Sequence, residues 1–299
     1  MSLAALLAAS PALFTGTCLV LGLAIGSFLN VVIHRLPIML DRHWRAQCAE
    51  LSGEAATLPA VREERYNLVV PRSACPACRA PIAAWHNIPV LSYLLLRGRC
   101  ASCGARISPR YPLVEALTGL LSALVAWKFG FGWPALAALV LTWFLVALAA
   151  IDIDHQLLPD SLTLPLMWIG LVLSLAAPAP GGAPVPVDPR ASLIGAAAGY
   201  LSLWAIYHVF RALTAKEGMG YGDFKLLAAL GAWLGWQMLL PTVLIAAAVG
   251  AVVGIVLIAA RRRSGSLPIA FGPFLAAAGW LMLMFGHQLV GFYLGLFPQ

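Results

Sequence analysis

Charged side chains are scarce in this sequence. Its 12 acidic and 19 basic residues make up 10% of the chain, whereas an ordinary soluble domain carries about 25% charged residues. Hydrophobic residues make up 61%, and the mean hydropathy is +0.87. These values exclude a soluble globular domain and predict an all-α protein that crosses a lipid bilayer several times. The net charge of +7 is small and dispersed, so we expect no nucleic-acid partner.

Eight apolar segments are candidates for transmembrane helices. They lie near residues 11–33, 113–127, 133–151, 162–175, 192–213, 224–240, 242–260 and 269–297. Because Lys and Arg concentrate in cytoplasmic loops, their distribution predicts which side of the membrane each connection occupies. It places both termini outside, together with the Pro- and Gly-rich loop 176–190. The cytoplasmic connections are then 34–110, 152–160, 211–223 and the three arginines at 261–263.

The first apolar segment is followed by a long polar connection. It has no basic flank before it and no small-residue cleavage site after it, so we expect a retained helix over 1–33. Gly22, Gly26 and Ser27 would let a neighbouring helix pack closely. The basic residues that follow this segment, together with Pro37, predict that the chain leaves the membrane on the cytoplasmic side. We therefore expect a cytoplasmic cysteine-rich domain over 34–110 and a helical membrane domain over 111–299.

Four of the six cysteines form two CxxC pairs in this Arg-rich cytoplasmic stretch. They are Cys75, Cys78, Cys100 and Cys103. Two such pairs, 21 residues apart, are typical of a small zinc-ribbon-like domain, although the same cysteines could form disulfides. Four thiolates would leave no open position on the metal, so the expected zinc is structural. His86 is an alternative ligand, but a lone histidine is more often a surface or packing residue.

Two acidic positions stand out in a chain with so few acids. Asp223 follows Gly218, Gly220 and Gly222, and glycine is costly in a helix, so these residues indicate a bend that presents the aspartate. Asp152 lies at the end of the segment 133–151, with Asp154 and Asp160 close behind. Acids beside a membrane segment are usually functional. Helix capping is the alternative, and we favour it for Asp160, which precedes a new apolar run.

Two neighbouring carboxylates can perform acid–base catalysis, because close like charges leave one of them protonated. The ionised member can take a proton from a water that attacks a peptide carbonyl, while the protonated member hydrogen-bonds the carbonyl oxygen. An ion-coupled transporter could also use such acids, but the sequence shows no matching halves and the acids lie at a membrane edge. A scaffold in which the acids only cap helices is the third alternative.

Several motifs together resemble the type IV prepilin leader peptidases, which are GxGD aspartic proteases of the membrane. Gly220-Tyr221-Gly222-Asp223 matches the GxGD signature. The other motifs follow in the same order as in that family, and the resemblance covers nearly the whole chain. They are 26–37, the paired CxxC motifs, 110–115, 152–160 and 216–225.

The resemblance implies a bifunctional enzyme of the bacterial inner membrane. Such enzymes remove the basic leader of type IV prepilins or type II secretion pseudopilins at the cytoplasmic face, after a glycine. They then methylate the new N-terminal residue with S-adenosylmethionine. By position in the motifs, Asp152 and Asp223 match the catalytic pair. The expected supporting residues are Gly220, Gly222, Lys225, Asp154 and Asp160.

The sequence gives fewer indications of a methyltransferase site, because it has no Gly-rich nucleotide-binding motif of the kind found in soluble proteins. Its attribution to the cysteine-rich domain rests on the resemblance, and Gly98 and Arg99 are the residues we associate with it. One departure from the family lies in this domain. His86 stands in a Trp-x-Asn-Ile-Pro motif where the family often has a glutamate, so the methyltransferase half could differ.

Overall fold

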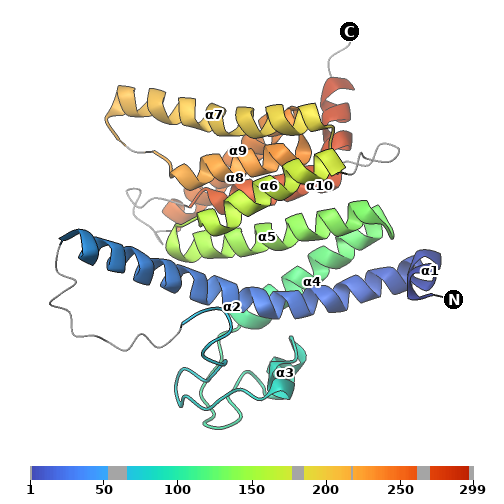
Figure 1. Cartoon of the computed structure of the whole chain (residues 1–299), viewed down its shortest axis with the longest axis vertical. Helices are drawn as coiled ribbons and strands as arrows, with labels where there is room; N and C mark the ends of the chain where they lie inside the picture. Colours follow the sequence, from blue (N-terminus) through green and yellow to red (C-terminus); the bar gives the residue numbers. More distant parts are fainter. Residues whose placement is uncertain (1, 53–65, 177–184, 217, 261–269, 296–299) are drawn as a thin grey trace. The chain divides into compact units, whose positions relative to one another are not determined.

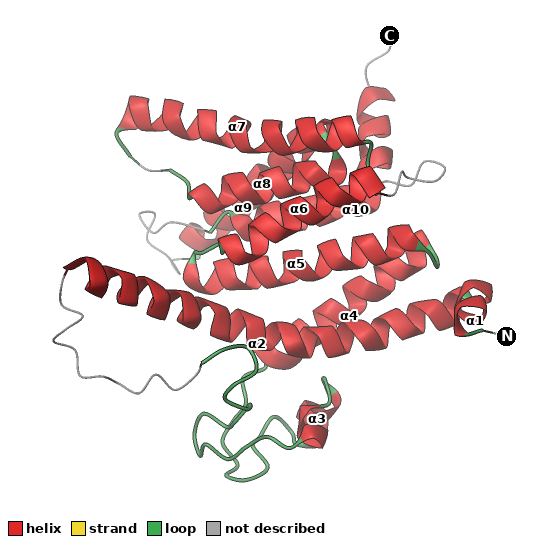
Figure 2. Cartoon of the chain, in the orientation of Figure 1, coloured by secondary structure: helices red, strands yellow, loops and turns green. Residues whose placement is uncertain are grey.

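The computed structural model describes residues 2–52, 66–176, 185–216, 218–260 and 270–295. Helices dominate these residues, and no strand occurs among them apart from two isolated β-bridges (Figures 1 and 2). The elements are α1 (Leu3–Ala9), α2 (Pro11–Ser52), η2 (Ala84–Asn87), α3 (Leu91–Leu95), α4 (Arg110–Phe129), α5 (Trp133–His155), α6 (Asp160–Ala176), α7 (Pro189–Thr214), α8 (Tyr221–Leu234), η4 (Trp236–Met238), α9 (Leu239–Ala259) and α10 (Gly272–Gly295).

Every expected apolar segment contains a helix, which confirms an all-α polytopic membrane protein. Six helical stretches in the described residues are long and apolar enough to cross a bilayer. They are 11–52, 110–129, 133–155, 189–214, 236–259 and 272–291. The fourth and sixth expected segments form the shorter helices α6 and α8, of 17 and 14 residues. Residues 177–184 of the Pro-rich loop and the arginines at 261–263 lie outside the described residues.

Two expected helix ends were wrong. The segment 224–240 is not one helix, because α8 ends at Leu234 and Gly235 turns the chain with φ +81°. Leu239 and Leu240 already belong to α9. Pro37 does not end α2, which continues to Ser52. A proline removes one backbone hydrogen bond, and here the helix continues through that loss.

The chain forms two compact units, one comprising Thr15–Leu124 and the other Met1–Phe14 with Val125–Gln299. In the unit Thr15–Leu124, α2 and α4 pack closely through glycines. A Cβ at Gly26 would lie only 2.7 Å from the Cα of Glu115, and one at Gly22 would lie 2.8 Å from the carbonyl oxygen of Thr118. The close helix packing expected at Gly22 and Gly26 is therefore confirmed.

Helix α8 is the core of the unit that contains Val125–Gln299. It packs against α6, α7 and α10, and all its residues from Leu226 to Leu234 are buried (Figure 1). A Cβ on Gly195 of α7 or Gly231 of α8 would collide with the backbone of the other glycine. On the α6 side, the indole nitrogen of Trp233 donates a 2.7 Å hydrogen bond to the carbonyl of Leu166. These contacts fix the position of α8 and, with it, of Asp223.

Candidate active site and cysteine cluster

Asp152 and Asp223 are both buried, with 5% and 7% of their surfaces exposed. Asp152 lies in the last turn of α5, and Asp223 lies in the first turn of α8. A carboxylate in the first turn of a helix interacts favourably with the helix dipole. The preceding Gly220 adopts an extended conformation, and its carbonyl accepts a 3.2 Å hydrogen bond from the N–H of Asp223. The chain therefore enters α8 through an extended glycine, as expected, but Asp223 itself lies within the helix and is buried rather than presented from the bend.

The structure brings the two aspartates together around Leu158. A Cβ at Gly222 would lie 2.7 Å from the Cβ of Leu158, and a Cβ at Gly272 would lie 3.1 Å from its Cδ1. The same position on Gly272 is 2.5 Å from Oδ2 of Asp152. The carboxyl groups of Asp152 and Asp223 are close enough to interact electrostatically. Two acids 71 positions apart in the chain thus lie near each other in the fold.

The Oδ2 atom of Asp152 is buried, and no hydrogen bond of ordinary geometry reaches it within the described chain. Buried polar atoms are nearly always hydrogen-bonded, because an unmet carboxylate oxygen is costly. This exception lies beside the backbone of Gly272, which is the first residue of α10. An oxygen in this state can accept a proton, or a hydrogen bond from water or substrate, as a general acid–base catalyst must.

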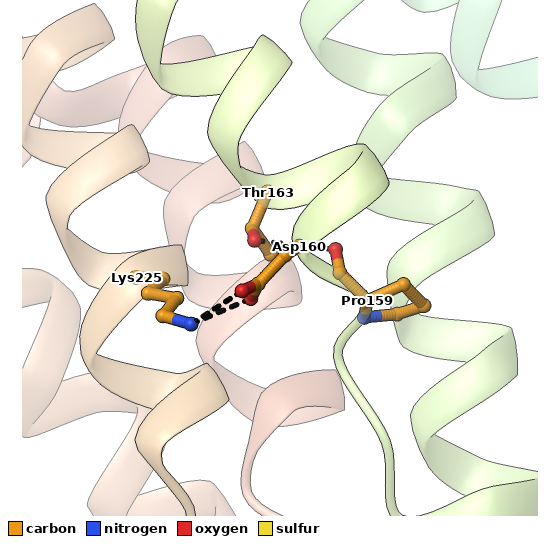
Figure 3. Close-up of polar contacts among 4 residues, drawn as sticks. All are labelled: Pro159, Asp160, Thr163 and Lys225. Atoms are coloured by element: carbon orange, nitrogen blue, oxygen red, sulfur yellow. Dashed lines mark hydrogen bonds and ion pairs between the residues drawn. The ribbon is translucent and has the colours of Figure 1, made fainter. Parts of the chain in front are cut away.

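Lys225 and Asp160 form an ion pair between the start of α8 and the start of α6 (Figure 3). The Lys225 Nζ lies 2.6 and 2.7 Å from the two carboxylate oxygens of Asp160, so the contact is bidentate. Lys225 follows Asp223 by two residues in α8, and Asp160 is the first residue of α6. Asp160 thus lies inside the first turn of α6, where a carboxylate suits the helix dipole, rather than at the N-cap position expected for it, and its contact with Lys225 links α6 to α8.

The other expected supporting residues differ in their exposure. Asp154 is exposed. Gly220 is exposed too, but a Cβ there would lie 3.8 Å from Oδ2 of Asp223, and Gly222 is half-buried against Leu158. Gly272 contacts Asp152, although it was not among the expected site residues. The signal for it was the Gly272-Pro273 pair, which indicates a turn and a helix start.

Each CxxC pair lies in a turn, and the two turns share one hydrogen-bond pattern. The N–H of Cys75 donates to the carbonyl of Ala80 at 3.0 Å, and the N–H of Cys100 donates to that of Ala105 at 2.8 Å. The residue after the second cysteine has positive φ in both turns, +58° at Arg79 and +71° at Gly104. The chain therefore builds two similar knuckles, as in a zinc ribbon.

The four cysteines fit a structural zinc ion. Their Sγ atoms all lie within 4.8 Å of one another, and those of Cys75 and Cys103 are 3.9 Å apart. A tetrahedral ZnS₄ site with Zn–S bonds of about 2.3 Å has sulfurs about 3.8 Å apart. Backbone N–H groups of Cys103 and Ser102 lower the pKa of the Cys100 thiol to about 6, whereas the neighbouring cysteine side chains help to raise the pKa of Cys103, so without a metal the thiolate is favoured at Cys100 and not at Cys103.

The remaining residues singled out in this region lie outside the cluster. His86 is not part of this group of metal-ligating side chains. Gly98 belongs to the second knuckle, where its carbonyl accepts a 2.8 Å hydrogen bond from the N–H of Ile107. It has φ +67°, and a Cβ there would lie 2.9 Å from the Tyr93 ring, so a glycine suits this position. Arg99 forms an isolated β-bridge with Arg106.

Comparisons with known proteins agree with the motif resemblance along the chain. Residues 20–129 match the bacterial peptidase A24 N-terminal domain, and residues 139–255 match the type IV leader peptidase family. No solved structure matches the chain.

Curated relatives cover nearly the whole length. A prepilin leader peptidase/N-methyltransferase from Stutzerimonas stutzeri is 52% identical over 288 residues, which is 96% of each chain. One from Aeromonas salmonicida is 55% identical over 284 residues, or 95% of each. One from Neisseria gonorrhoeae is 50% identical over 265 residues, covering 88% of this chain and 87% of the relative. This chain therefore belongs to the prepilin leader peptidase/N-methyltransferase family.

Proposed function

We propose that this protein is a membrane aspartic endopeptidase and N-methyltransferase. It cleaves the basic leader from type IV prepilins or pseudopilins after a glycine, and then methylates the new N-terminal residue. The observation that carries the proteolytic half is the pair of buried carboxylates that α5 and α8 bring together, Asp152 and Asp223. The family membership supports both halves.

Asp152 and Asp223 share the acid–base work of hydrolysis. The ionised carboxylate takes a proton from a water molecule as the water oxygen attacks the carbonyl carbon of the glycine. The protonated carboxyl hydrogen-bonds the carbonyl oxygen, where negative charge develops. Collapse of the tetrahedral intermediate breaks the C–N bond, and the departing amine takes up a proton. The surrounding apolar residues strengthen these interactions, because they exclude most water.

The cleavage takes place at the cytoplasmic edge of the inner membrane. The distribution of Lys and Arg supports this orientation, since the connections that carry Asp152 and Asp223 fall on the same side as the Arg-rich region 34–110. A prepilin has a basic leader ahead of a long apolar helix, so its cleavage point lies at that edge. The apolar helix of the substrate would lie in the bilayer against the spans of the enzyme.

The cysteine-rich region 34–110 contributes to the methyl transfer, and the membrane domain 111–299 carries the protease. S-adenosylmethionine supplies the methyl group, which the new N-terminal amine accepts. The amine nitrogen forms its bond to the methyl carbon as the carbon–sulfur bond breaks, and the nitrogen then loses a proton. A zinc ion held by the four cysteines would link the two knuckles of this region and contribute directly to its folding.

The test uses the full-length protein in detergent with a prepilin and S-adenosylmethionine, read by intact mass. The wild type should remove the leader and add one methyl group. Asp152→Asn and Asp223→Asn should each slow cleavage by about 10²- to 10⁴-fold, because each removes one acid–base partner. Asp41→Asn, an exposed aspartate of α2, is the matched control and should cleave normally. Normal cleavage by either site variant would refute the pair.

A further inference from the structure

We propose that a cavity within the unit Thr15–Leu124 binds S-adenosylmethionine, with Glu115 as its buried anionic group. This proposal rests on the methyltransferase half of the proposed function. The cavity has a volume of about 640 Å³. Pockets for small ligands and cofactors usually measure about 300–1,000 Å³, so it is large enough for a nucleoside derivative. All the residues that line it belong to this one unit.

Two motifs that the aspartate pair does not use meet at this cavity. From the motif 26–37, it is lined by Ser27, Asn30, Val31, His34 and Arg35. Their spacing of three and four residues places them on one face of α2. From the motif 110–115, it is lined by Tyr111, Pro112 and Glu115 of α4. Both motifs carry the family resemblance in the sequence, and in the structure both line this cavity.

Glu115 is a buried acid held in place by the cavity wall. It is 9% exposed, and its Oε2 accepts a 2.8 Å hydrogen bond from the N–H of Val90. Val90 has φ +60°, a conformation unfavourable for a β-branched residue, so the Glu115 contact helps to hold the start of α3. Ser27 and Asn30 of α2 are polar neighbours of the Glu115 side chain. The carboxylate is thus pre-positioned rather than free to turn away.

The cavity also carries fixed positive charge. Arg35 is 8% exposed and donates hydrogen bonds to the carbonyl oxygens of Asn67 at 2.9 Å and Pro71 at 2.7 Å. Arg72 and Arg106 line the same cavity. Three arginines against one acid would repel the basic leader of a prepilin. The charge balance therefore favours a small ligand that contains both signs of charge over the leader peptide.

S-adenosylmethionine has the groups that this cavity complements. Its sulfonium and ammonium groups are cations, which a buried carboxylate such as Glu115 attracts. Its carboxylate is an anion, which arginines bind well. Its adenine is a flat aromatic ring, and the cavity wall carries the rings of Tyr66, Tyr93 and Tyr111. The cavity lining therefore offers partners for the charged groups and the adenine of the ligand.

The zinc knuckles form part of the same wall. Cys75 and Cys100 line the cavity, as do residues 76–77 and 101–102 of the two CxxC turns. His86, where the family often has a glutamate, also lines it. The position at which this chain departs from the family thus lies at the proposed ligand site. Glu115 still supplies an acidic group there. Zinc would then act on methylation by holding the wall in shape.

Binding of S-adenosylhomocysteine, measured by calorimetry on the full-length protein in detergent, tests the proposal without relying on turnover. Glu115→Gln keeps an acceptor for the Val90 N–H but removes the charge, so it should weaken binding at least about tenfold. Val31→Phe adds bulk at the cavity wall and should weaken binding similarly. Val20→Phe is the matched control, because Val20 is also in α2 but is 66% exposed and lies away from the cavity. Zinc content checks the fold of each variant.

The outcomes separate this proposal from the one on which it rests. Wild-type affinity in both Glu115→Gln and Val31→Phe, in a protein that still methylates prepilin, would overturn the cavity assignment alone. A wild-type protein that neither binds S-adenosylhomocysteine nor methylates cleaved prepilin would overturn the methyltransferase function as well. As a second readout, a photoreactive azido-adenosyl analogue should label peptides from 66–115 in the wild type. Labelling confined to residues 125–299 would contradict the proposal.

Discussion

Replacing Gly272 with alanine should disable the aspartate pair without touching either aspartate. Gly272 begins α10, and its backbone approaches the carboxylate of Asp152. An added Cβ would lie 2.5 Å from Oδ2 and 3.1 Å from Cγ of Asp152, and 3.1 Å from Cδ1 of Leu158. The backbone of Gly272 does not adopt a left-handed conformation, so alanine is allowed there. The substitution therefore acts only through the steric contacts of the added methyl group.

The size of the effect follows from the displacement that alanine requires. Ordinary contacts of a Cβ begin at about 3.4 Å, so the carboxylate oxygen of Asp152 must retreat by about 0.9 Å. Leu158 occupies the other side of the new methyl group and limits how it can be accommodated. A misplacement of about 1 Å in a catalytic group can cost about 10²-fold in rate. That loss corresponds to about 2.7 kcal/mol in the activation free energy.

The assay is the initial rate of leader removal from a purified prepilin, with kcat and KM measured separately. Gly272→Ala should lower kcat about 10²-fold, since the displaced carboxylate acts in the chemical step. Gly291→Ala is the matched control, because Gly291 lies in the same helix and a Cβ there would meet nothing within 4 Å. A Gly272→Ala enzyme whose kcat stays within about twofold of the Gly291→Ala value would refute the reasoning.

Two further predictions concern the ion pair and the cysteines. Lys225→Met should cost no more than about 1 kcal/mol in the free energy of unfolding, because Asp160 is 56% exposed, yet it should slow cleavage several-fold if the pair positions the start of α8. Equal cleavage rates for Lys225→Met and the wild type would show that the pair has no positioning role. Cys100→Ser should remove stoichiometric zinc, measured by elemental analysis, and impair methylation; a full zinc complement in this variant would contradict the four-thiolate site.

Most of the fold was predictable because hydropathy decides where a chain crosses a membrane. The sequence predicted a helix in each of the eight apolar segments, and each contains one. It missed the break at Gly235, where an apolar chain turns without any charged residue to mark the end of a helix. It also placed the end of the first helix too early, since a proline and a basic flank do not oblige a long helix to stop.

The two aspartates of the site could be predicted from the sequence, because charged residues are scarce in this chain. Asp152 and Asp223 were conspicuous because acids are rare and costly in this chain, and the structure shows both buried and near each other. Their catalytic role remains a prediction. Contacts between distant segments carried no comparable signal. The Lys225–Asp160 ion pair joins residues 65 positions apart, and the approach of Gly272 to Asp152 depends on the packing of α10 on α5.

The alternation of helix direction explains why the acids meet. Asp152 ends α5 and Asp160 begins α6, so both lie at the connection between these helices. The chain then runs away through α6 and returns through α7, which brings the start of α8 back to the same end. The ion pair between Asp160 and Lys225 demonstrates that this return occurs. Under the proposed function, the substrate reaches the two aspartates from that end of their unit. A prepilin suits this proposal, because its cleavage point lies directly beside an apolar helix.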